Sequence, residues 1–232
     1  MKTRLVKTVK INLQYINHRI CKEVCEDTIN ILTDQNLITE YKKSKSVQNK
    51  IKKIKSIFEK NNIEMEKQEN ILNDYILELI PPGTKGVIRG NKFNEIVKNY
   101  INNLQLDNEI FEIVFEKKCK LYETNEIPDW YILEKKTGKA IIGMNQLDLW
   151  SGGQQLNRGF KYLNNNKINT EKSKLLCVVC NKIQIQTNKN KTYKIFEMGF
   201  SNDTLCYINN IANIVNKYFK YDKIIYKNLL NS

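Results

Sequence analysis

The feature that most constrains the fold is a pair of strand-like segments joined by a tight turn, within residues 128–150. The first, DWYILE, follows a proline, and the connecting KKTG ends in a glycine, which is typical of a turn. The second is AIIGMNQLDLW. Because side chains alternate between the two faces of a strand, Met144, Gln146 and Asp148 share one face and can converge with Asp129 across the hairpin.

Other segments suggest the layers around this hairpin. IFEIVFEKKCKLYE before it, and KLLCVVCNKIQIQ and TYKIFEMGF after it, have the composition of strands. GGQQLNRGFKYLNNN predicts a crossing helix or loop, and NDTLCYINNIANIVNKYFKYDKIIYKNLL predicts a closing helix. An order of helix, antiparallel strands, crossover, strand and helix is typical of an α/β sandwich.

Residues 1–80 predict a helical region, because apolar residues recur every three or four positions. One expected apolar stripe consists of Ile51, Ile54, Ile57 and Phe58. The opposite face would carry lysines that can contact a DNA backbone or simply be solvated. These lysines are Lys50, Lys52, Lys53 and Lys55.

PPGTKGVIRGNKF interrupts the helical pattern with two prolines and three glycines. We therefore expect a loop there, with a boundary between a helical region at 1–80 and a second domain at 81–232. In the second domain Asn91 is expected to cap a helix that continues to about Leu104 and carries Glu95 just off its apolar face.

The composition restricts the chemistry. Lys and Arg total 38 against 25 Asp and Glu, a formal net charge of +13, which favours polyanionic partners. The single histidine, His18, excludes classes of site that need several imidazoles, such as two-histidine ribonucleases and HExxH proteases. Catalysis would have to use carboxylates with amide or lysine groups. The spacing of Cys177 and Cys180 suits a metal, but their apolar strand favours burial.

The sequence has no apolar run long enough to span a membrane, and MKTRLVKTVKINLQYI lacks the apolar core of a secretion signal. A cytoplasmic protein without a membrane partner is therefore expected.

The segment IPDWYILEKKTGKAIIGMNQLDLW resembles the core of the PD-(D/E)xK nucleases, in which an acid after proline joins an acid-x-lysine pair on the next strand. Gln146 and Asp148 follow Asp129 by 17 and 19 residues, within the spacing of that family. In this register Met144 occupies the place of the second acid and Gln146 that of the lysine, and some restriction enzymes of the family carry glutamine there. The resemblance implies a restriction-endonuclease-like mixed sheet flanked by helices, preceded here by a helical region.

Two residues can supply the missing acid, and the sequence leaves both open. Asp148 can act as the second metal ligand if the register shifts by one strand repeat, and Glu95 can reach in from the preceding helix. Both are expected to contribute. Gln146 would then orient the attacking water.

The flanking segments resemble those of type II restriction endonucleases, where basic residues contact phosphates and amides read base edges. The expected DNA-binding residues are Lys85, Arg89, Gln154, Gln155, Asn157, Arg158 and Lys161.

The resemblance implies Mg²⁺-dependent, sequence-specific cleavage of double-stranded DNA by a homodimer, with a cognate DNA methyltransferase as partner. Two alternatives are a non-catalytic DNA-binding protein, in which Met144 marks a lost active site, and a nuclease directed at RNA or at DNA structure.

Overall fold

A computed structural model describes residues 39, 42–147, 163, 171–180 and 191–221 of the chain. The described residues up to Lys92 form one compact unit, and those from Phe93 onward form the other. No helix among the described residues combines the length and the apolar content that a membrane crossing requires.

The first unit is built from helices, as the apolar periodicity predicts. α3 (Lys45–Lys60) is followed by α4 (Met65–Asp74) and the short α5 (Ile76–Leu79). A small core holds them together, because each helix buries part of one face. Its fully buried members are Val47, Phe58, Leu72, Ile76 and Leu79.

The expected stripe on α3 is only partly correct. Phe58 is buried and Ile51 and Ile54 are half-buried, but Ile57 is exposed. Lys50, expected on the outer face, is half-buried and donates from Nζ to the carbonyl oxygen of Leu79 at 3.1 Å. A long side chain can bury its stem and still satisfy its charged end in this way.

The expected loop at PPGTKGVIRGNKF is wrong. This segment belongs to α6 (Pro82–Asn102), which passes from the first unit into the second. Pro82 is the first helical residue, a position where the missing N–H of proline removes no helical hydrogen bond. Asn91 consequently lies inside the helix and does not cap it.

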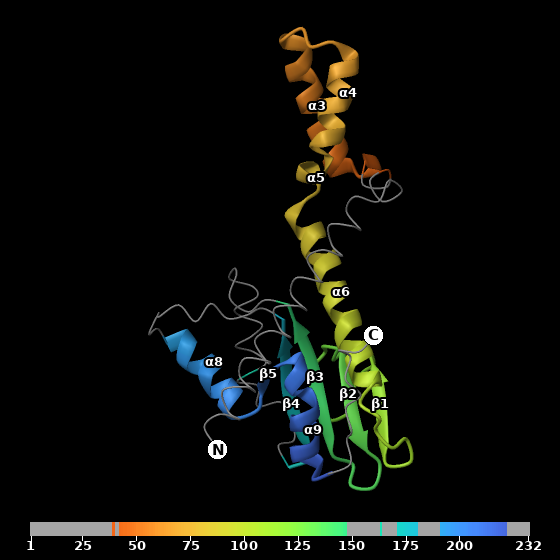
Figure 1. The fold of residues 1–232 in the computed structure, drawn as a ribbon, viewed down its shortest axis with the longest axis vertical. Helices are drawn as coiled ribbons and strands as arrows, with labels where there is room; N and C mark the ends of the chain where they lie inside the picture. Colours follow the sequence, from red (N-terminus) through yellow and green to blue (C-terminus); the bar gives the residue numbers. More distant parts are fainter. Residues whose placement is uncertain (1–38, 40–41, 148–162, 164–170, 181–190, 222–232) are drawn as a thin grey trace, which may run out of the picture. The chain divides into compact units, whose positions relative to one another are not determined.

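The second unit contains a five-stranded mixed sheet in the order β1–β2–β3–β4–β5 (Figure 1). The strands are β1 (Phe111–Phe115), β2 (Trp130–Glu134), β3 (Ala140–Gln146), β4 (Ser173–Val179) and β5 (Leu205–Tyr207). β1 pairs with β2, and β2 with β3, in antiparallel fashion, whereas β3, β4 and β5 run parallel to one another. The α/β class expected from the sequence is therefore confirmed.

The turn between β2 and β3 has the chemistry that the sequence suggests. Gly138 has a φ of 69°, in the left-handed region that glycine adopts without strain. Its N–H donates to the carbonyl oxygen of Glu134 at 2.9 Å, which closes the hairpin.

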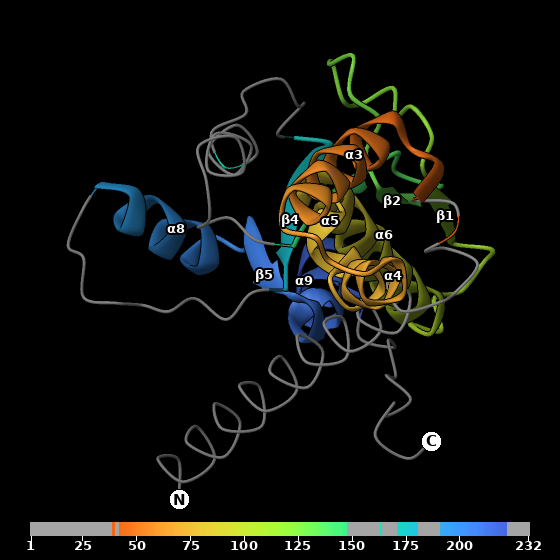
Figure 2. The same ribbon diagram turned by 90° about the horizontal axis from the view of Figure 1, so that it is seen from above.

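Apolar clusters cover both faces of the sheet. On one face, α6 from Phe93 onward and α9 (Ile211–Phe219) pack against Trp130, Ile132 and the alternate residues of β4. On the other face, α8 (Lys191–Ser201) contributes Phe196 to a cluster that includes Met144 and Cys177. α8 lies beside β5, at the end of the sheet opposite β1 (Figures 1 and 2).

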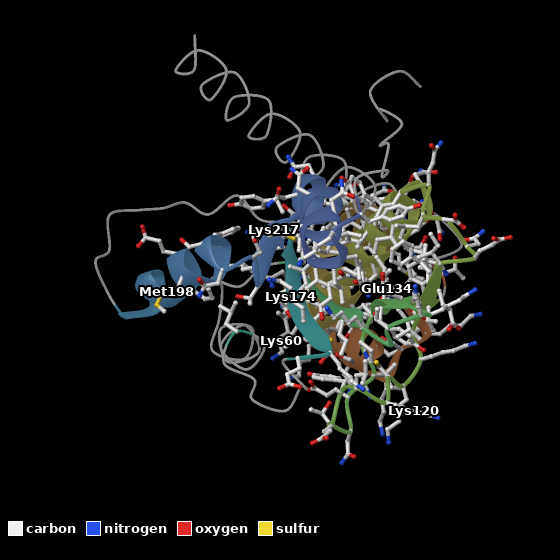
Figure 3. The ribbon with its side chains drawn as sticks, turned by 90° about the horizontal axis from the view of Figure 1, so that it is seen from below. Lys60, Lys120, Glu134, Lys174, Met198 and Lys217 are labelled. Atoms are coloured by element: carbon white, nitrogen blue, oxygen red, sulfur yellow. The ribbon has the colours of Figure 1, made fainter. Side chains whose placement is uncertain are left out.

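Two predictions about the C-terminal part are wrong. TYKIFEMGF is helical, in α8, because its core contacts recur every three residues: Phe196 and Gly199 are buried, whereas Met198 between them is 60% exposed (Figure 3). The closing helix begins at Ile211 instead of near residue 202, since Leu205–Tyr207 pair with β4 as a strand.

Candidate functional site

Asp129 lies immediately before β2, directly after the buried Pro128. The last residue pair of the β2–β3 register is Trp130 with Gly143, and Asp129 directly precedes Trp130 in the chain. Its backbone is held from both sides, because its N–H donates to the Gly143 carbonyl oxygen and its carbonyl oxygen accepts from Glu116 N–H, both at 3.1 Å. The chain therefore presents this half-buried carboxylate from a fixed backbone position.

Two asparagines hold the carboxylate of Asp129. Asn94 of α6 donates from Nδ2 to Oδ1 at 3.3 Å, and the backbone N–H of Asn145 in β3 donates to Oδ2 at 2.6 Å. The side chain of Asn145 donates from Nδ2 to Asn94 Oδ1 at 3.2 Å and accepts from Trp130 Nε1 at 3.0 Å. Four side chains from three segments thus form one hydrogen-bonded group, the Asp129 network (Asn94, Asp129, Trp130 and Asn145).

The charge of Asp129 affects the pKa of a cysteine on the opposite face of the sheet. Cys177 in β4 is fully buried and lies next to Met144 in the parallel register. Burial, and secondly the nearby charge of Asp129, raises the pKa of the Cys177 thiol well above its ordinary range. Cys177 and Cys180 are both buried, as their apolar strand predicts, and this thiol is held protonated.

The other predicted catalytic residues have different environments. Met144 is 5% exposed and belongs to the apolar cluster that includes Phe196, so it packs as a core residue. Gln146, the last residue of β3, is buried. Glu95 is exposed on α6, and its neighbour Asn94 donates a hydrogen bond to Asp129. Asp148 lies outside the described residues.

Most of the predicted DNA-binding residues cannot be placed. Lys85 and Arg89 lie in α6, within the first unit, and Arg89 is exposed. The remaining five lie outside the described part of the chain: Gln154, Gln155, Asn157, Arg158 and Lys161.

Among the described residues no group of three or more histidine, cysteine or acidic side chains is close enough to hold a metal ion. Mg²⁺, however, is often held through one or two carboxylates, with water and substrate phosphate completing its shell. Asp129 could supply one such carboxylate, and the amide oxygen of Gln146 is a further ligand type that suits this ion. The thioether of Met144 does not.

Asn94, Asn145 and the polar role of Trp130 were not predicted from the sequence. One signal could have found Asn145: a buried tryptophan needs an acceptor for its indole N–H, and Asn145 is the polar residue on the same face of β3 as Gly143, which pairs with Trp130. Asn94 gave no such signal, because helical periodicity does not specify a contact between α6 and a loop.

No protein-family model matches this chain, and no match is found among curated proteins or solved structures.

Proposed function

We propose that the chain is a Mg²⁺-dependent endonuclease of the restriction type, which cleaves double-stranded DNA at a specific sequence. The observation that carries the proposal is the position of Asp129: it follows a buried proline, precedes β2, and accepts a hydrogen bond at Oδ2 from the backbone N–H of Asn145, the residue after Met144 in β3. Three antiparallel strands followed by a parallel fourth are also consistent with the PD-(D/E)xK fold that the sequence resembles.

In this proposal Asp129 holds the metal, with Asp148 and Glu95 as the further acids. The bound ion would lower the pKa of a water molecule and stabilise charge on the phosphate. Gln146, two residues after Met144 on the same strand face, would orient the attacking water. The net charge of +13 would attract the DNA backbone to the chain.

The predicted DNA contacts extend the proposal to specificity. Lys85, Arg89, Arg158 and Lys161 would neutralise phosphates. The amides of Gln154, Gln155 and Asn157 would read base edges. A palindromic target would require a homodimer, since the symmetry of the protein then matches that of the site. A methyltransferase of the same specificity would protect host DNA.

One observation favours a second candidate, a DNA-binding protein without cleavage activity. Met144 stands at the sequence position where the resembled family carries its second acid, and it is buried in the core. In this second candidate, the position of the metal-binding acid is occupied by a core residue, Met144.

Cleavage of plasmid DNA in the presence of Mg²⁺ distinguishes the two candidates. We expect discrete fragments with the native chain and none with Asp129→Asn, a change that keeps shape and removes charge. Asp74→Asn, the same change at an exposed position at the end of α4, is the matched control and should cleave like the native chain. Intact plasmid that migrates more slowly with all three proteins would support the binding protein instead.

A further inference from the structure

The direction of the hydrogen bonds in the Asp129 network is determined by one donor-only group, the indole of Trp130. Trp130 is 1% exposed, and its Nε1–H donates to Asn145 Oδ1. Because the indole cannot accept a hydrogen bond, the Asn145 amide must turn its oxygen toward Trp130. Its nitrogen then faces Asn94, to whose Oδ1 it donates. The usual ambiguity between the two ends of an amide is removed here.

Asn94 takes its orientation from Asn145 in turn. With its oxygen facing Asn145, its nitrogen faces Asp129 and donates to Oδ1. The backbone N–H of Asn145 donates to Oδ2 of the same carboxylate. Both carboxylate oxygens of Asp129 thus accept a hydrogen bond from an N–H group, one from Asn94 and one from Asn145. Together with the bond between Asn145 and Asn94, these bonds close a ring. An ionised carboxylate, which only accepts hydrogen bonds, is the form that this arrangement suits.

Gly143 makes this ring possible. A Cβ atom added at Gly143 would overlap the indole of Trp130, so the ring system lies directly over the glycine in β3. Asn145 is two residues further along the same face of the strand. The indole therefore reaches Asn145 only because no side chain intervenes at Gly143.

We propose that Asn94 and Asn145 are positioning residues for Asp129, oriented by Trp130, which fix the direction in which its carboxylate is presented. The proposal rests on the proposed function in one respect, that Asp129 acts on metal and DNA. Partners that orient a metal-binding carboxylate typically contribute about 10- to 100-fold to activity or metal affinity.

Asn145→Asp tests the direction of the hydrogen bonds in the ring, because it keeps the shape of the side chain and replaces its donor with an acceptor. Asn94 would then turn its nitrogen toward residue 145 and its oxygen toward Asp129. We expect kcat/KM for DNA cleavage to fall about 10- to 100-fold, with a higher Mg²⁺ concentration needed for half-maximal activity. The matched control is Asn99→Asp, at an exposed position of α6, the helix that also carries Asn94. It should leave both kcat/KM and the Mg²⁺ requirement unchanged.

Solution NMR supplies a readout that does not depend on activity. In the native chain we expect ¹⁵N–¹³C couplings through the hydrogen bonds that join Asn94 Nδ2 and Asn145 N to the Asp129 carboxyl carbon. The Asn94 coupling should disappear in Asn145→Asp and persist in Asn99→Asp.

The outcomes separate the two proposals. A native chain that does not cleave DNA would refute the proposed function, and the couplings alone would then decide whether the ring orients Asp129. An Asn94 coupling that survives in Asn145→Asp would overturn the orienting role. Loss of the coupling with unchanged cleavage and Mg²⁺ dependence would show that the orientation has no effect on function, and would overturn the positioning role.

Discussion

The two faces of β3 beside Asp129 differ in chemistry. On the face toward α6, Asn145 connects Trp130, Asn94 and the carboxylate through hydrogen bonds. On the face toward α8, Met144 packs beside Cys177 in an apolar cluster. Amides and backbone thus support the carboxylate on one face, whereas Met144, the residue before Asn145, belongs to the apolar core of the other face.

The largest effect on this comparison is expected from Gly143→Ala. The added methyl group would overlap the Trp130 indole, which is buried and cannot move without losing its hydrogen bond to Asn145. We expect a loss of about 3 kcal/mol in the free energy of unfolding, measured by urea denaturation, because overpacking forces side chains and backbone to shift. Unchanged stability would mean that the indole does not lie over β3.

Met144→Glu reverses the difference between the two faces by placing an acid one residue before Asn145, whose backbone N–H donates to Asp129. A carboxylate at this buried site, close to that of Asp129, should lower the free energy of unfolding by about 2 kcal/mol. Millimolar Mg²⁺ should restore part of the loss, because an ion that binds only the folded state stabilises it. Thermal unfolding with and without Mg²⁺ measures both effects.

Met144→Gln is the matched control, with the same shape and no charge. It should be destabilised as well but should show no additional stabilisation by Mg²⁺. An equal Mg²⁺ response in the two variants would show that residue 144 does not face a metal position.

The pH dependence of stability tests whether the thiol of Cys177, on the apolar face, has a raised pKa. Burial and the charge of Asp129 raise the pKa of this thiol in the folded state above its ordinary value of 9.0. Above about pH 9 the unfolded chain loses this proton while the folded chain keeps it, so the thiol makes stability fall as pH rises. The slope is at most about 1.4 kcal/mol per pH unit.

Urea unfolding of the native chain and of Cys177→Ala, between pH 8 and pH 10, isolates this contribution. The variant should be less stable throughout, because a buried atom is lost, but its stability should fall less steeply with pH. Parallel curves for the two proteins would contradict a raised pKa at Cys177.

The smallest expected effect comes from Gly90→Ala in α6, and it has the opposite sign to Gly143→Ala. A Cβ atom at Gly90 meets nothing within 4 Å, and the residue lies inside a helix. Alanine should therefore stabilise the chain by about 0.5–1 kcal/mol in urea denaturation. Destabilisation would indicate that the glycine is needed for a close approach at this position.

The parts of the fold that could be predicted are those with a strong local period. The hairpin of β2 and β3 followed from its composition, its turn and the glycine at 138, and the helices of the first unit followed from their apolar repeats. Errors arose where tertiary context overrides local signals. Pro82 begins a helix instead of ending one, and Leu205–Tyr207 form a strand only because β4 offers a partner.

The candidate site was predictable to the same limited extent. The position of Asp129 beside the hairpin of β2 and β3 followed from the strand pattern and the turn. The asparagines that hold the carboxylate did not, because Asn94 and Asp129 are 35 positions apart in sequence and meet only when α6 packs on the sheet. A polar contact between distant segments leaves no period in the sequence.

Whether Asp129 holds the metal can be measured by the binding of Mn²⁺, an oxygen-preferring substitute for Mg²⁺, followed by electron paramagnetic resonance. We expect the native chain and Asp74→Asn to bind Mn²⁺ with the same affinity, and Asp129→Asn to lose this binding while keeping its fold by circular dichroism. Equal Mn²⁺ binding by native chain and Asp129→Asn would contradict the claim that Asp129 holds the metal.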